Sequence, residues 1–160
     1  MTTIDELVAR LDRVESELAL YRLAHDYCAG ADHRDEGRWL SVWTTDAVWA
    51  AGDDPDHTFT GIDAITAAVR RQWETFPIML HATSNHVVAI DGDHATGRCD
   101  AVVIVQLPDL QWIVGGGSYD DEYRRDPEHG WRIRRRAVVR PFDLAPLAPA
   151  IGPVLPDAED

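Results

Sequence analysis

The feature that most limits the fold of this chain is a change of hydrophobic period at Pro77. Before Pro77, apolar residues recur mainly at steps of three and four, which is typical of amphipathic helices. After Pro77, apolar and polar residues alternate, which is typical of strands with one buried face. The pattern predicts an α+β fold in which three helices pack on one face of a strongly bent antiparallel sheet. A sheet bent in this way forms a cone-like barrel, and the interior of the cone is the natural place for a pocket.

The first helix is predicted from its N-cap and from a long apolar stripe. Thr3 and Glu6 stand at the spacing of a capping box. Apolar residues then follow at alternating steps of four and three over residues 7–28, so a helix is expected up to about residue 29. The stripe includes His25 and places it on the buried side, where a hydrogen-bonded core histidine is expected rather than a ligand.

The remaining elements follow from period, glycine and proline. After a short second helix, strands are expected at 46–51 and 57–60, a helix at 62–75, and strands at 78–90, 94–107, 111–125 and 131–140. Three consecutive glycines at 115–117 predict a bend or bulge within one of these strands. Residues 1–142 are expected to form a single domain, and residues 143–160 a Pro-rich acidic tail over its surface. Residues 3–18 would be an N-terminal helical extension, with polar flanks typical of a helix on a surface or against a neighbouring subunit.

Composition excludes several classes of function. The chain has 28 acidic and 15 basic residues, a net charge of -13, which argues against nucleic acid and anionic membranes as partners. All the basic residues are Arg, so lysine Schiff bases and P-loop chemistry are excluded. The two cysteines make no disulfide framework. The N-terminus lacks a signal peptide and no apolar run has the length of a membrane span, so a cytoplasmic protein is expected.

A polar corner after the first helix is the first candidate for a site. Gly30 suits the left-handed stop of a helix, and Asp32 follows just past it. A carboxylate at a helix end beside apolar walls is a common way to place a catalytic group. The alternative is that Asp32 merely caps the second helix. Four bulky uncharged residues are the candidates for the pocket wall: Trp39, Trp43, Trp49 and Met79.

The second candidate is a histidine in the strand that follows Pro77. His81 and His86 lie five residues apart in an apolar strand, so they face opposite sides if the strand is regular and are poor candidates for a shared metal. No metal site is expected. A histidine facing an apolar interior needs a partner, and Asp32 is the best candidate to orient His81. The Tyr27 hydroxyl could point into the same cavity if the helix breaks at Gly30.

Arginines alternate along the last strand. Arg132 and Arg134 are interpreted as residues of a solvated edge. For Arg136 and Arg140, two alternatives remain open: the same solvated edge, or a position in the cavity from which one or both hold an anion or a developing oxyanion.

These residues together resemble the SnoaL-like branch of the nuclear transport factor 2-like superfamily over residues 15–142. The segments that carry the resemblance are GADHRDEGRWLSVW, LHATSN and GGGSYDDEYRRD. They are similar to segments of hexachlorocyclohexane dehydrochlorinases. Tyr27, Asp32, His81 and Arg140 resemble a pattern of bile-acid 7α-dehydratases, and scytalone dehydratases more distantly share the aspartate–histidine pair. The resemblance implies a cone-like barrel with a deep pocket, His81 as general base, Asp32 as its orienting partner, and no metal or organic cofactor. Two departures stand out: the dehydrochlorinases have a lysine in place of Tyr27, and the further acidic residue of the dehydratases falls near Val103.

The expected function is therefore a cofactor-independent lyase or isomerase, dehydratase-like in kind. His81 would take a proton from a mostly apolar, ring-sized small molecule, Tyr27 would donate a hydrogen bond, and Arg136 or Arg140 would steady negative charge. Two alternatives from other classes are a non-catalytic carrier of small molecules and a structural small subunit like that of ring-hydroxylating oxygenases. A homo-oligomer, trimer or dimer, is expected from the half-polar stripe on the first helix.

Overall fold

The computed structural model describes residues 2–52 and 55–146, with side chains described as far as residue 139. Its helices are α1 (Ile4–Asp32), α2 (Glu36–Ser41) and α3 (Ile62–Thr75), with a short 3-10 turn, η1 (Pro55–His57). Its strands are β1 (Trp43–Ala50), β2 (Thr58–Thr60), β3 (Ile78–Asp91), β4 (His94–Gln106), β5 (Trp112–Asp126) and β6 (Gly130–Pro146). The elements expected from the sequence are thus present in the expected order.

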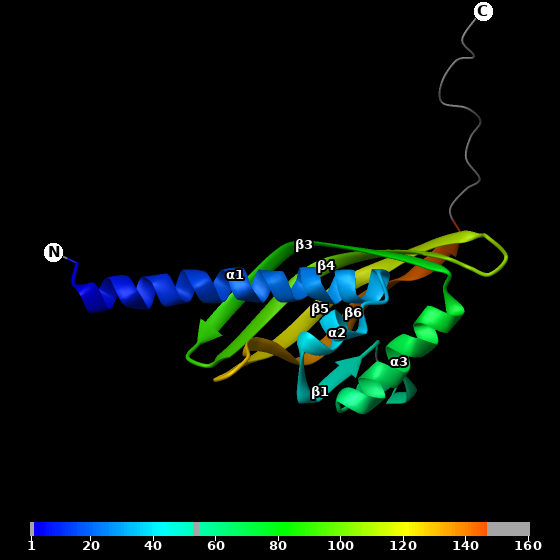
Figure 1. Cartoon of the computed structure of the whole chain (residues 1–160). Helices are drawn as coiled ribbons and strands as arrows, with labels where there is room; N and C mark the ends of the chain where they lie inside the picture. Colours follow the sequence, from blue (N-terminus) through cyan, green and yellow to red (C-terminus); the bar gives the residue numbers. More distant parts are fainter. Residues whose placement is uncertain (1, 53–54, 147–160) are drawn as a thin grey trace, which may run out of the picture.

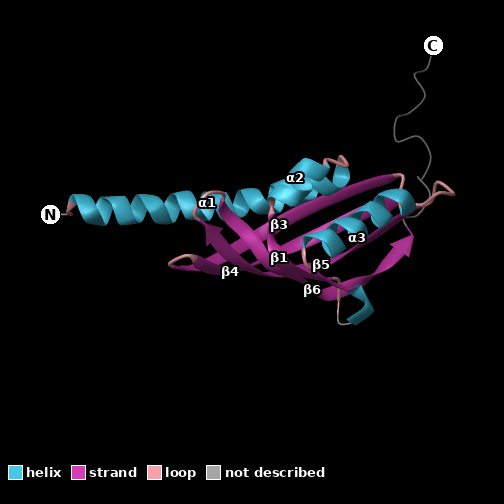
Figure 2. Cartoon of the chain, turned by 60° about the horizontal axis from the view of Figure 1, so that its bottom comes forward, coloured by secondary structure: helices cyan, strands magenta, loops and turns pink. Residues whose placement is uncertain are grey.

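The strands form one six-stranded sheet with the order β2-β1-β6-β5-β4-β3. The helices lie along one side of this curved, unclosed sheet (Figures 1 and 2), and the predicted α+β cone-like fold is confirmed. One expectation needs correction, because β1 pairs with β6 in parallel and the sheet is mixed. A parallel pair needs a long connection, and everything from β2 to β5 lies between these two strands along the chain.

The face of α1 that packs on the sheet differs from the predicted one. The capping box of Thr3 and Glu6 is present. The buried residues of the helix include Leu20, Leu23 and Tyr27, whereas the predicted stripe is largely exposed. His25 is exposed and is not a core residue. The N-terminal part of α1 extends beyond the sheet (Figure 1).

Gly30 does not end α1, because the helix continues to Asp32. Its role is to allow close packing: a Cβ at Gly30 would lie 2.8 Å from the backbone nitrogen of Trp39. Asp35, and not Asp32, caps α2, since its carboxylate accepts the backbone N–H of Arg38 at 3.0 Å. Asp32 is therefore left for another partner.

Tryptophans fill the core between α1, α2 and β1. Trp39 and Trp43 are 0% and 1% exposed, and their ring centroids lie 5.6 Å apart. Trp49 lies 5.5 Å from Trp39 by the same measure, edge to face. Such aromatic contacts add to the energy of area burial. These side chains fix the end of α1 against the sheet.

Two bulges decide which side chains face the helices. In β3 the register shifts between Ser84 and Val87, with Asn85 at a positive φ of 53°. In β6 an extra residue between Ile133 and Arg135 shifts the pairing with β5. A bulge of one residue moves every later side chain to the other face.

The ends of the domain are only partly within the described residues. β6 continues to Pro146, so the first part of the predicted tail, residues 143–146, is strand. Residues 147–160, the rest of that tail, lie outside the described part of the chain. Across the described residues, no helix combines the length and the apolar character that crossing a membrane requires.

Candidate active site

Asp32 and His81 form a close hydrogen-bonded pair. The Nδ1 atom of His81 lies 2.5 Å from Oδ1 of Asp32, and the backbone N–H of His81 donates to Oδ2 at 2.8 Å. Both side chains are 9% exposed. The carboxylate comes from the last turn of α1 and the imidazole from β3, so the pair joins the helix to the sheet. Because Asp32 holds Nδ1, the other ring nitrogen, Nε2, is the atom left for chemistry.

Tyr27 and Tyr119 place two hydroxyl groups near this pair. Tyr27 lies about 1.4 helical turns before Asp32, and its ring is perpendicular to that of His81 at a centroid distance of 6.1 Å. The two rings meet edge to face with their centroids 5.7 Å apart, and each phenol influences the pKa of the other. Burial raises the pKa of both phenols far above its usual range, while the nearby Arg136 lowers it. Both hydroxyls therefore stay protonated and act as hydrogen-bond donors.

Arg136 and Asp121 form a fully buried ion pair behind the two tyrosines. The guanidinium donates to Asp121 through Nε at 2.9 Å and through Nη2 at 2.7 Å, and both side chains are 0% exposed. Its Cζ lies 4.2 Å from the ring centroid of Tyr27 and 4.4 Å from that of Tyr119. Burial by itself would lower the pKa of Arg136, but the Asp121 carboxylate and its hydrogen bonds raise it overall. A permanent positive charge thus lies against both phenol rings.

His81, Tyr27 and Tyr119 meet at a cavity of about 250 Å³. Its remaining lining residues are mostly apolar or small: Trp49, Ala51, Gln72, Ala101, Val103, Gly115, Gly116, Gly117 and Val138. The glycines lie where β5 shifts its register against β6, as their sequence predicted. The indole Nε1 of Trp49 is buried and has no hydrogen-bond partner in the described part of the chain. A larger hollow of about 380 Å³ near Ile90 and Arg134 does not include His81.

Apart from Arg136, the predicted site residues fall into three groups. Asp32, His81, Tyr27 and Trp49 meet at this cavity or at the pair that borders it. Trp39, Trp43 and Met79 lie in the hydrophobic core and are not among the cavity-lining residues. The rings of Trp39 and Trp43 pack against each other and against Trp49 and Tyr27. The side chain of Arg140 lies outside the described residues.

Arg136 occupies a position that neither sequence interpretation anticipated. It is not a residue of a solvated edge, and it is not among the residues that line the cavity. The β6 bulge brings it to the inner face, where Asp121 is its counter-ion and Tyr27 and Tyr119 lie between it and the cavity. Arg132 donates instead to the carbonyl of Trp43, and Arg134 lies 3.3 Å from a carboxylate oxygen of Asp46.

Tyr119 and Asp121 were missed at the sequence level, although a signal was present. In a regular strand, residues 119, 121 and 123 share a face with Gly117. An aspartate between two aromatic residues on a buried face requires a cation as a partner. That requirement points to the arginine-rich strand β6.

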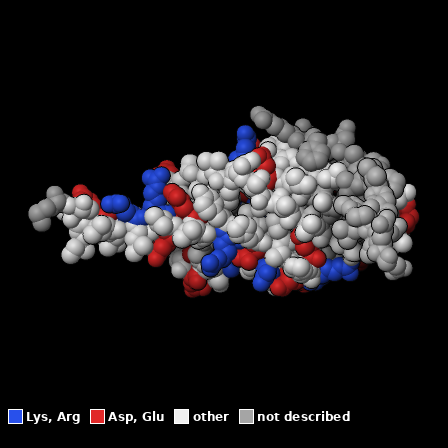
Figure 3. All heavy atoms as spheres, turned by 90° about the horizontal axis from the view of Figure 1, so that it is seen from above, with Lys and Arg blue, Asp and Glu red and all other residues white. Residues whose placement is uncertain are grey.

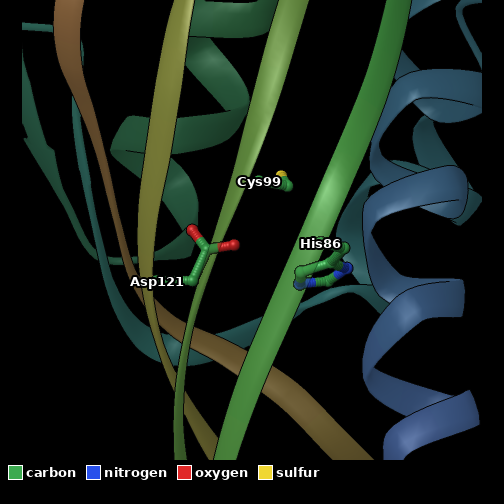
Figure 4. Close-up of side chains that lie close together, drawn as sticks. All are labelled: His86, Cys99 and Asp121. Carbon is green, nitrogen blue, oxygen red and sulfur yellow. The ribbon is translucent and has the colours of Figure 1, made fainter.

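A second group of potential ligand side chains, which includes His86, lies on the same face of the sheet. Figure 4 shows His86, Cys99 and Asp121 projecting from the neighbouring strands β3, β4 and β5, and one possible ligand atom from each lies within 4.8 Å of the others. The β3 bulge explains why His86 shares the inner face with His81, contrary to the alternation expected for a regular strand. Its Nε2 lies 3.1 Å from the Tyr123 hydroxyl, which donates to Asp121 at 2.7 Å.

This cluster fits a metal ion poorly. Both oxygens of Asp121 already accept hydrogen bonds from Arg136, so a metal cation there would lie beside a guanidinium. Burial raises the pKa of the Cys99 thiol to about 12, which disfavours the thiolate that metals bind. Burial also lowers the pKa of His86, which keeps the imidazole neutral within the hydrogen-bonded chain. These residues are better described as part of the packed and hydrogen-bonded surroundings of the Arg136–Asp121 ion pair.

Comparison with known proteins agrees with this architecture. Residues 12–137 match the model of the family described as the SnoaL-like domain. An uncharacterized protein of Mycobacterium tuberculosis is 28% identical over 146 residues, which cover 87% of this chain and 95% of that protein. The gamma-hexachlorocyclohexane dehydrochlorinase of Sphingobium indicum is 29% identical over 141 residues, which cover 86% of this chain and 88% of the enzyme.

Solved structures give the same result. A hexachlorocyclohexane dehydrochlorinase of Novosphingobium barchaimii superposes with a TM-score of 0.78 at 28% identity, covering 92% of this chain and 99% of that structure. A scytalone dehydratase-like protein of Novosphingobium aromaticivorans gives a TM-score of 0.73 at 18% identity, covering 85% and 88% of the two chains. An identity this low shows the shared fold alone. On the family match over most of its length and on its fold, the chain belongs to the SnoaL-like domain family of nuclear transport factor 2-like proteins.

Proposed function

We propose that this chain is a cofactor-independent lyase or isomerase that removes a proton from a mostly apolar, ring-sized small molecule. The observation that carries the proposal is the Asp32–His81 pair, nearly buried and bordering a cavity. The dehydrochlorinases among its relatives support a lyase type of activity. A carrier of apolar molecules has no need of such a pair, since burying an aspartate and a histidine costs stability.

In the proposed reaction His81 is the general base. Asp32 holds Nδ1–H, so the lone pair of Nε2 takes a proton from a carbon beside an electron-withdrawing group. In an elimination, the electrons of the broken C–H bond form a C=C bond, and the leaving group departs from the next carbon with its bonding pair. In an isomerisation, the same electrons form a C=C bond and the C=O π pair moves onto the carbonyl oxygen. The C=O bond re-forms when the imidazolium returns the proton at another carbon. Asp32 stabilises the imidazolium in both cases.

Tyr27 is proposed to donate a hydrogen bond where negative charge develops. Burial keeps the Tyr27 and Tyr119 hydroxyls protonated, and both residues line the cavity, so an O–H is present there for an acceptor on the substrate. The charge of Arg136 behind both rings makes this O–H a stronger donor. Arg136 is therefore proposed to act through the tyrosines and not by touching the substrate. The preferred substrate carries a carbonyl, hydroxyl or halide on an otherwise apolar ring.

The test compares turnover of His81→Gln and Asp32→Asn with that of the unaltered protein. A panel of cyclic ketones, cyclic alcohols and chlorinated cyclohexanes, γ-hexachlorocyclohexane included, is assayed for product and for chloride release. We expect each variant to lose about 100- to 10,000-fold in rate while its melting temperature shows that it is folded.

The chain offers a matched control for the substitution. His129 and Asp126 form another histidine–aspartate pair, with Nδ1 and Oδ1 2.9 Å apart, but in an exposed turn. His129→Gln should leave turnover unchanged. A folded His81→Gln variant with full turnover would refute the catalytic role. If no compound of the panel is turned over but some raise the melting temperature, and His81→Gln leaves that shift unchanged, the cavity is a binding site only.

A further inference from the structure

The N-terminal half of α1 carries an apolar surface that nothing in the described structure covers. Its six large apolar side chains are between 51% and 78% exposed: Ile4, Leu7, Val8, Leu11, Val14 and Leu18. At about 100° per residue, this stripe lies on the side of the helix opposite the buried residues Leu20, Leu23 and Tyr27. A surface helix of a monomer normally has polar residues there. The N-terminal part of the stripe lies on the end of α1 that projects from the rest of the molecule (Figures 1 and 3).

The spacing of the stripe is that of a coiled-coil seam. Ile4, Leu11 and Leu18 recur at intervals of seven, and Leu7 and Val14 lie three residues after the first two of them. These are the a and d positions of a heptad, at which apolar residues pack between two supercoiled helices. Val8 lies beside the seam and widens it.

The charges that flank the seam favour a second copy of the same helix in parallel orientation. In a parallel pair, a g residue faces the e residue five positions later on the other helix. Arg10 then faces Glu15 of the second copy, and Glu17 faces Arg22 of the second copy. Two-fold symmetry makes each contact twice, so the parallel pair brings together four pairs of opposite charges. The antiparallel pair places g residues against g residues, and only Arg10 with Glu17 is then complementary.

The helix is held in place before any partner binds. Arg125 of β5 pairs with Asp12 at 3.0 Å and also donates to Ser16, which ties α1 to the sheet at the middle of the stripe. An isolated helix of two heptads is marginal in water, because nucleation is costly. Here the N-terminal half of α1 continues a helix whose C-terminal half is packed on the sheet. Association therefore loses little conformational entropy.

From these features we infer that two copies of this chain associate through a parallel coiled coil formed by residues 4–18 of α1. The sheets lie on the outer sides of such a dimer, since the seam and the sheet occupy opposite faces of the helix. The contact is self-complementary, as a two-fold interface must be.

The first test is the mass of the full chain by light scattering at about 50 μM protein, in comparison with the chain mass of 17.9 kDa. We expect about twice the chain mass for the unaltered protein and a monomer for Leu11→Glu, which places a charge in the seam. Ala9→Glu is the matched control, because it adds the same charge to the same turn on the exposed opposite side. It should remain dimeric. A monomeric unaltered protein, or a Leu11→Glu variant of unchanged mass, overturns the inference.

The second test concerns orientation. In a parallel dimer residue 18 lies opposite residue 18 of the second copy, within the range of Cα distances that a disulfide spans. Leu18→Cys should therefore oxidise to a covalent dimer on a denaturing gel, and Ala9→Cys should not. The native Cys28 and Cys99 are buried and act as an internal background. If Leu18→Cys stays uncrosslinked while light scattering reports a dimer, the parallel arrangement is wrong.

Discussion

Asp32 and Asp121 are both buried carboxylates near the cavity, and their partners give them different roles. Asp32 holds a ring nitrogen of His81, a group that can gain and lose a proton. Asp121 holds the guanidinium of Arg136, which keeps its proton at any ordinary pH. The first pair is therefore suited to chemistry, and the second to fixing a charge where two tyrosine rings meet it.

We predict that Asp121→Asn destabilises the fold by about 3–5 kcal/mol, because it leaves Arg136 as a buried charge without a counter-ion. Arg136→Met alone should also be costly, since it leaves the Asp121 carboxylate unpaired. The double variant Asp121→Asn with Arg136→Met should cost clearly less than the sum of the two single changes. Urea unfolding of all four proteins measures this coupling. Additive costs would show that the ion pair contributes nothing beyond its separate parts.

At the residue scale, the sequence predicts the Asp32–His81 pair better than the Asp121–Arg136 pair. His81 stands out because a histidine in an apolar strand needs a partner, and Asp32 lies at the end of the helix that covers the strand. Arg136 reaches the inner face only through the β6 bulge, and a bulge leaves no clear mark in an alternating sequence. The role of Tyr119 is hidden for the same reason. Its hydroxyl gains a role only because Arg136 lies behind its ring, and that position of Arg136 depends on the β6 bulge.

At the scale of elements, α1 shows the limit of periodicity. Its sequence holds two apolar faces, one towards the sheet and one towards solvent. The period identifies a helix, but it does not say which face meets which neighbour. The exposure of His25 follows directly, since the stripe that includes it is the outer one. The helices and strands themselves are predicted well, because composition and period agree along most of the chain.

The contact of α1 with α2 depends on Gly30. A Cβ added there would lie 2.8 Å from the backbone nitrogen and 3.0 Å from the Cα atom of Trp39, distances that require the backbone to move. We predict that Gly30→Ala lowers the free energy of unfolding by about 1–3 kcal/mol, the usual cost of overpacking. Chemical denaturation, with fluorescence of the buried tryptophans as the signal, measures the change.

Gly37→Ala is the matched control for that experiment. Gly37 also lies in a helix, but an added Cβ would meet only the Asp35 side chain, at 3.6 Å. Removing a helical glycine with room for a methyl group should stabilise the protein by about 0.5–1 kcal/mol. Equal effects of the two substitutions would mean that the approach of Trp39 to Gly30 is not tight.

At the scale of the whole molecule, the cavity is built from segments far apart along the chain. Its lining residues run from Tyr27 on α1 to Val138 on β6. The sequence predicts the class of fold because helices and alternating strands limit the possible layers. It does not predict the place of β1, since the pairing of β1 with β6 joins opposite ends of the domain.

That pairing has a consequence for the order in which the protein folds. β3 to β6 are neighbours joined by short turns, whereas β1 and β2 reach the rest of the sheet only through β6. Contacts between distant parts of a chain form late, because closing the loop costs entropy before the contact repays it. During refolding, pulsed hydrogen exchange should therefore find the amides of β3–β5 protected before those of β1; simultaneous protection would contradict this order. On the ribosome, β1 is made early but has no strand to join, other than its short neighbour β2, until nearly the whole chain has emerged. Until β6 has emerged, the apolar surfaces of the tryptophans in and beside β1 stay exposed to solvent. A chaperone would be needed most during this interval.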